Sequence, residues 1–146
     1  MNLYLKQYQK NQIETSSPEK ILIMLYDGAI QFVNIAKNEM SSGNEPLNIQ
    51  KIHNNIMSAQ KIINEFQNTL DIELGGEVAQ NLYDLYTYLY KRLVDANIKK
   101  DATILEEVLF HLKELRNTWQ QAIDIANKEK GESYSLHEDE YEDDDE

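Results

Sequence analysis

Apolar residues recur at helical intervals along most of the chain, in four segments separated by short polar or glycine-containing breaks. In the first segment, Ser17 offers an N-cap oxygen and Pro18 takes the first helical position, where its missing N–H costs nothing. Ser16 with Glu19 is an alternative capping box at the same place. We therefore expect a helix over residues 18–40, which ends at the breaker cluster 41–44.

This first helix carries two apolar stripes, rotated from each other by roughly 100–160° at about 100° per residue. The stripe that we expect to face the core consists of Ile21, Leu22, Leu25, Ala29, Phe32, Ala36 and Met40. The second stripe consists of Ile23, Tyr26, Ile30 and Val33. Since both faces must be covered, the second is either a partner-binding surface or a face buried by neighbours on both sides of a central helix. The pattern favours a binding surface.

Three further helices follow. Pro46 opens the second, Gly75-Gly76 separates it from the third, and Asp101 is suited to cap the fourth. Their core-facing stripes are Ile49, Ile52, Ile56, Ala59, Ile63, Phe66 and Leu70; then Val78, Leu82, Leu85, Leu89, Leu93 and Ala96; then Leu105, Val108, Leu109, Leu112, Leu115, Trp119, Ile123 and Ala126. Because short connections favour antiparallel neighbours, we expect an all-α fold, an antiparallel up-down four-helix bundle.

The chain divides into three parts. Residues 1–16 form an N-terminal arm that is too polar for a core helix, residues 17–130 form the bundle domain, and residues 131–146 form an acidic tail. The apolar residues of the arm are Leu3, Tyr4, Leu5, Tyr8 and Ile13. From residue 132 onward the tail has nine acidic residues and no Lys or Arg, so we expect it to be disordered and to act as a solubilising extension rather than as a binding site for a basic partner.

The net charge of −12 is concentrated in that tail, which leaves 14 basic against 17 acidic residues in the preceding part, a net charge of −3. A near-neutral body with an acidic tail argues against binding to nucleic acid. The absence of cysteine fits a reducing compartment. Because no apolar run approaches the ~20 residues of a membrane span and no signal sequence precedes the arm, we expect a soluble cytoplasmic protein without membrane insertion.

The sequence offers no constellation for catalysis, so we expect no enzyme, no cofactor and no metal site. Glu107 and His111 are four residues apart, but a lone pair is a weak signal for a metal and fits a structural histidine better. The run that begins at His111 faintly resembles histidine-phosphotransfer bundles, yet Glu114 and Leu115 occupy the positions of their lysine and glycine. Gly75-Gly76 lacks the remainder of a phosphate-binding loop.

Apolar residues also lie outside the core-facing stripes of the third and fourth helices. Tyr83, Tyr90 and Val94 share one side of the third, and Phe110 and Ile125 point away from the stripe of the fourth. Together with the second stripe of the first helix and the arm, they predict a surface for a protein partner. The candidate partner-binding residues are Tyr8, Ile13, Ile23, Tyr26, Ile30, Val33, Tyr83, Tyr90, Val94, Phe110 and Ile125.

Several of these positions belong to longer motifs. A first block contains Tyr8-Gln9, Asn11, Ile13, Ser17-Pro18, Lys20-Ile21 and Leu25-Tyr26-Asp27-Gly28-Ala29-Ile30. A second contains Ala59-Gln60, Ile62-Ile63, Leu70-Asp71, Gly75-Gly76-Glu77-Val78-Ala79, Asn81-Leu82, Leu85-Tyr86, Tyr88, Arg92-Leu93, Ala96-Asn97, Leu115-Arg116 and Trp119. With these motifs the chain resembles the FliS family of flagellin-specific export chaperones, from about Tyr8 to Trp119. Ser58 and Phe66 depart from the family, where lysine and leucine are expected.

The resemblance implies an antiparallel helical bundle that binds the disordered C-terminal segment of flagellin in the cytoplasm. It implies that such a chaperone prevents premature polymerisation and delivers the subunit to the flagellar type III export gate. We expect the protein to be monomeric when free and to form a 1:1 complex with its client. The residues leave two alternatives open: a homodimeric helical-bundle adaptor, with the second stripe as its interface, and a degenerate histidine-phosphotransfer bundle.

Overall fold

The computed structural model describes residues 17–143, with side chains through residue 131, so the expected arm with Tyr8 and Ile13 lies outside the described residues. Four helices make up this part of the chain: α2 (Pro18–Met40), α3 (Ile49–Thr69), α4 (Ile72–Lys99) and α5 (Ala102–Asp143). Residues 17–143 contain no strand. The all-α prediction is therefore confirmed.

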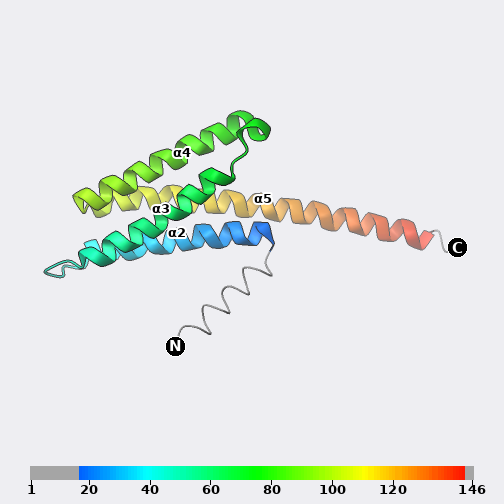
Figure 1. Ribbon diagram of the computed structural model, residues 1–146. Coiled ribbons are helices and arrows are strands. Elements are labelled where there is room, and N and C mark those ends of the chain that lie inside the picture. Colours follow the sequence, from blue (N-terminus) through cyan, green and yellow to red (C-terminus); the bar gives the residue numbers. More distant parts are fainter. Residues whose placement is uncertain (1–16, 144–146) are drawn as a thin grey trace.

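The four helices pack in a ring. α2 lies against α3 and α5, and α4 lies against the same two helices, so that α2 and α4 are diagonal to each other (Figure 1). Residues 70–71 join α3 to α4, and residues 100–101 join α4 to α5. Such short connections hold consecutive helices antiparallel, which gives the up-down bundle expected from the sequence.

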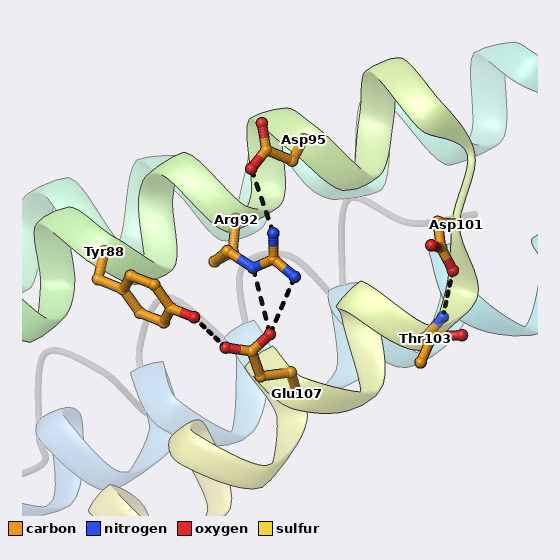
Figure 2. Close-up of polar contacts among 6 residues, drawn as sticks. All are labelled: Tyr88, Arg92, Asp95, Asp101, Thr103 and Glu107. Atoms are coloured by element: carbon orange, nitrogen blue, oxygen red, sulfur yellow. Dashed lines mark hydrogen bonds and ion pairs between the residues drawn. The ribbon is translucent and has the colours of Figure 1, made fainter.

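Two of the helix starts are capped as expected. The Ser17 hydroxyl accepts a hydrogen bond from the backbone N–H of Lys20 at 3.3 Å, directly before the proline at the first position of α2. The Asp101 carboxylate accepts one from the backbone N–H of Thr103 at 2.9 Å at the start of α5 (Figure 2). The starts of α2 and α5 are therefore set by local hydrogen bonds, which can be predicted from the capping residues in the sequence.

α3 begins at Ile49, later than Pro46, because Asn48 is its cap. The Asn48 side chain accepts from the backbone N–H of Lys51 at 3.0 Å, and its own backbone N–H donates to the Glu39 carboxylate at 2.8 Å. Glu39 is buried near the end of α2. This charged group therefore fixes the connection between α2 and α3, and its burial is compensated by a hydrogen bond.

Both expected stripes of α2 contribute to the core. The expected core stripe is confirmed in Ala29 and Ala36, which are fully buried, and in Leu22, Leu25, Phe32 and Met40, which pack against the core. Tyr26, Ala29, Val33 and Ala36, spaced by three and four residues, are fully buried among the other helices. The expectation that Tyr26 and Val33 lie on an outward stripe is therefore wrong, and both leave the set of candidate partner-binding residues. The physical reason is that α2 packs against both α3 and α5, so the side between those two contacts points to the bundle axis.

The expected core stripes of the other helices are correct in their central parts and wrong at three ends. Val78, Ile49 and Ala126 are exposed, although the period places all three inward. Ile49 is the first residue of α3, Val78 lies two residues after a kink in α4 at Gly76, and Ala126 lies beyond the buried part of α5. Conversely, Tyr86 of α4, which the stripe omits, is fully enclosed.

Tyr26 and Tyr86 meet at the centre of the bundle through a buried hydrogen bond between their hydroxyl groups. Phe66 of α3 stacks on Tyr26, with ring centroids 4.3 Å apart, and lies 5.5 Å from the ring of Tyr86. Burial raises the pKa of both phenols above the ordinary tyrosine value. The diagonal helices are thus connected by a hydrogen bond between two phenols, with an aromatic ring from a third helix against them.

α5 continues as a helix through Asp143, beyond the point near residue 130 where the sequence predicts a disordered tail. Figure 1 shows this C-terminal part of α5 extending past the other helices. After Gly131 the segment contains no proline, and many of its residues favour helix. The end of the bundle therefore does not coincide with the end of its last helix.

Leu112→Ala should destabilise the bundle by roughly 2–5 kcal/mol, because it removes a fully buried side chain of α5 and leaves a cavity. Chemical denaturation measures the change in unfolding free energy. The matched control is Phe110→Ala, which alters an exposed side chain on the same helix and should change stability by no more than about 0.5 kcal/mol. Equal effects of the two substitutions would contradict the assigned core.

The phenol pair should make the bundle sensitive to alkaline pH. A raised folded-state pKa of Tyr26 and Tyr86 means that their stabilising contribution is complete below the unfolded pKa of about 10 and is lost as pH rises above it. Tyrosinate absorbance should show both phenols ionising only with unfolding. Tyr83→Phe, which removes an exposed phenol, should leave this pH dependence unchanged, and ionisation of all tyrosines before unfolding would refute the buried pair.

Candidate interaction surface

Tyr83, Tyr90 and Val94 lie together on the side of α4 that faces α3. Hydrogen bonds from the Gln67 side chain of α3 show that this side of α4 faces α3. Gln67 donates to the backbone carbonyl of Tyr83 at 3.1 Å and to the Thr87 hydroxyl at 2.7 Å. Tyr83 and Val94 are exposed, and Tyr90 is half-buried against the core. The sequence pattern thus correctly grouped these three residues.

α3 contributes Met57 to the same surface. A hydrogen bond between Asn97 of α4 and the His53 ring, at 3.0 Å, ties the two helices together, and Met57 follows His53 by one helical turn. Met57 is exposed as well. We call the surface formed by Met57, Tyr83, Tyr90 and Val94 the α3–α4 face.

Ile23 and Ile30 occupy a different surface. Between them on α2, Asp27 pairs with Arg116 of α5 at 2.9 Å, which places this side of α2 toward α5. Both isoleucines are half-buried, and Ile30 packs against the core. They therefore do not join the α3–α4 face.

Phe110 and Ile125 are both exposed on α5, away from the α3–α4 face. The Phe110 ring lies 5.5 Å from the ring of His111, and the His111 ring meets Tyr88 of α4 edge-on at 6.4 Å. The structure thus brings the outward candidates of α4 together and leaves those of α2 and α5 on separate surfaces.

A polar cluster links α4 to α5 beside this ring contact (Figure 2). The Arg92 guanidinium donates to the Glu107 carboxylate at 3.0 and 3.2 Å and to Asp95 at 3.3 Å, and the Tyr88 hydroxyl also donates to Glu107. These partners, Tyr88 first, lower the pKa of Glu107. Glu107, a weak candidate for metal ligation in the sequence, is therefore engaged in holding two helices together.

An apolar depression of about 260 Å³ lies at the corner where α3 turns into α4. We call it the corner depression; it is lined by Thr69, Leu70, Asp71, Leu74, Gly75, Val78, Ala79, Leu82 and Trp119. Leu74 is 87% exposed and Val78 is 69% exposed, so its rim is apolar and open to solvent. It was not anticipated from the sequence, which placed Val78 in the core.

The two glycines of α4 shape this depression. Gly76 has φ 57° and ψ −132°, in a region that only glycine adopts easily, and it separates the first turn of α4 from the rest of the helix. A Cβ atom at Gly75 would lie only 2.7 Å from the Cβ of Ala79. In the sequence, the Gly75-Gly76 pair was the only signal of the corner depression. It indicated a break in the helix, but not the surface that the break creates.

Across residues 17–143, none of the helices combines the length and the apolar character that crossing a membrane requires. The family model described as flagellar protein FliS matches residues 1–126. The chain belongs to the FliS family. The match spans the candidate surfaces described above and ends within α5.

Relatives in this family are named flagellar secretion chaperones. That of Bacillus subtilis is 32% identical over 123 residues, covering 84% of this chain and 88% of the relative. That of Campylobacter jejuni is 34% identical over 120 residues, covering 82% and 91%, and that of Salmonella typhimurium is 32% identical over 121 residues, covering 80% and 87%. Since FliS proteins are chaperones, a non-enzymatic class, the chain is not an enzyme.

Gly76→Ala should destabilise the protein by about 1–2 kcal/mol, because an L-residue is strained at this positive φ. The matched control is Gly28→Ala in the interior of α2, where the new Cβ would make an ordinary 3.6 Å contact with Ile62. This control should be neutral or stabilising by up to about 1 kcal/mol. Urea denaturation of both variants measures the difference; equal stabilities would argue against the kink.

Proposed function

We propose that this FliS-family protein is a cytoplasmic export chaperone that binds the disordered C-terminal segment of flagellin. It prevents premature polymerisation of flagellin and aids its delivery to the flagellar type III export gate. The observation that carries this proposal is the α3–α4 face, an apolar surface exposed on a folded bundle. Family membership supports the choice of flagellin as the client.

The chemistry of the α3–α4 face suits an unfolded amphipathic client. Tyr83, Tyr90 and Met57 offer aromatic and thioether surface, which adapts to varied apolar side chains, and no Asp, Glu, Lys, Arg or His belongs to the set. Exposed apolar clusters of this kind are typical of protein-interaction sites. A client helix would lay its apolar residues along the two helices, in the helix-in-groove manner.

The energetics favour an extended interface. Ordering a disordered segment on binding costs about 2–5 kcal/mol or more of the gross interaction energy. The four side chains of the α3–α4 face are too few to offset this cost alone, so the client must also contact other exposed apolar side chains. Phe110 and Ile125 on α5 are further candidates, and Ile23 and Ile30 on α2 offer partly buried surface.

A homodimeric adaptor is the competing function for the same surface. In that case the α3–α4 face would pair with a second copy, and the protein would be a stable dimer without any client. We propose instead a free monomer that forms a 1:1 complex with flagellin. Light scattering of the free protein and of its mixture with flagellin separates the two, because a client-free dimer would contradict the proposal.

The direct test is titration calorimetry with a C-terminal segment of flagellin. Val94→Asp, which places a charge in the α3–α4 face, should weaken binding tenfold or more, about 1.4 kcal/mol. The control is Met24→Asp on α2, because Met24 and Val94 are each 37% exposed and the new residue is the same. The control should bind like the wild type. Absence of binding by the wild type would refute the proposed function.

A further inference from the structure

The corner depression has no role in the fold or in the α3–α4 face as defined. Its walls come from the end of α3, from both sides of the Gly76 kink and from Trp119 of α5. Leu74 lies on the single turn before the kink and Val78 lies after it, so the kink itself creates the opening between them. Trp119 is half-buried and packs against the core, which gives the depression a rigid aromatic wall.

The lining indicates the chemistry of an occupant. Asp71 is the only ionisable residue in it, and its carboxylate already accepts the backbone N–H of Leu74 at 3.1 Å as the N-cap of α4. Recognition by charge is therefore not the main contribution. The volume of about 260 Å³ is below the usual 300–1,000 Å³ of a small-molecule site, and it suits one large apolar side chain.

The depression and the α3–α4 face follow each other along α4. Leu82 lines the depression and Tyr83, the next residue, begins the face about 100° further round the helix; on α3, Thr69 lines the depression and Gln67 bonds to the Tyr83 carbonyl. From Val94 to Val78 the helix rises by about 24 Å, which a helical client segment of about 16 residues would span. A client that binds along α4 and turns about a quarter of the way round it near Leu82 would therefore reach the corner.

A second copy of this chain is a poorer occupant. A specific protein–protein interface buries about 1,200 Å² or more in total. The depression with its rim of Leu74 and Val78 supplies only a small part of such an area. It is suited to strengthen a longer interface rather than to form one alone.

We propose that the corner depression is an anchor site for one large aliphatic or aromatic side chain of the flagellin C-terminal segment, with Trp119 as its wall. This inference rests on the proposed function. It adds a site on the chaperone that discriminates between client sequences by the side chain at one position. A client with a leucine, isoleucine or phenylalanine at the anchor position binds well, and one with a charged residue there binds at least tenfold more weakly.

Trp119 is the only tryptophan in the chain, so its fluorescence reports on the depression directly. The probe is a tryptophan-free C-terminal fragment of flagellin, added at saturation to the full chain. Trp119 emission should shift to shorter wavelength, and acrylamide should quench it less, because the client excludes water. The double variant Leu74→Asp/Val78→Asp should lose this shift and bind at least tenfold more weakly.

Both substituted side chains are exposed, so folding should survive, and circular dichroism checks it. The control is Ile98→Asp on the same helix, 75% exposed and about 30 Å from Val78, which should retain the shift at saturating client. Quenching of wild-type Trp119 tests the anchor without any variant.

The outcomes separate this inference from the proposed function. Two outcomes overturn the anchor site and leave the chaperone function intact. In one, calorimetry detects binding but Trp119 emission does not change; in the other, the double variant binds with unchanged affinity. Absence of binding refutes the function itself. A change in Trp119 emission on deletion of residues 1–16, or with protein concentration alone, would overturn the assignment in favour of the arm or a second copy.

Discussion

The buried contact between Tyr26 and Tyr86 is the constraint on which the arrangement of the bundle depends. A four-helix ring brings neighbours together through their flanks, but it leaves diagonal helices apart unless large side chains reach across the axis. Here two phenols do so: one hydroxyl donates a hydrogen bond to the other, and Phe66 packs against their rings. Because an unpaired buried hydroxyl is costly, this contact fixes how α2 and α4 are rotated and therefore which side chains remain outside.

That rotation explains what the sequence could predict about α2 and what it could not. Helix boundaries were predictable, because caps such as Ser17 and Asp101 act locally. The burial of the second apolar stripe was not. Tyr26 looks like an amphipathic surface residue until its partner is known, and that partner lies 60 residues further along the chain. Periodicity records how many faces of a helix are apolar, but not how many of them neighbouring helices cover.

The candidate interaction surface, too, was predictable from the sequence only in part. Tyr83, Tyr90 and Val94 lie on one side of α4, as the period predicts, since one regular helix carries all three, and Tyr83 and Val94 stay exposed beside α3. Val78 was misplaced because the helical period was extended up to the Gly75-Gly76 pair without allowing for a kink. The positive φ at Gly76 reorients the first turn of α4, and no count of apolar spacings reports such a change. A surface that arises at a kink, such as the corner depression, therefore escapes prediction from sequence.

The ring arrangement also governs the order in which the protein becomes folded during synthesis. α2 packs on α5, and the ion pair between Asp27 and Arg116 joins residues 89 positions apart. While the ribosome has made only α2 and α3, the buried face of α2 has one neighbour and Tyr26 lacks its partner on α4. Such long-range closure is slower than local helix pairing. The nascent chain therefore exposes its own apolar core until the last helix emerges, so the protein passes through a stage in which its own apolar residues are unshielded.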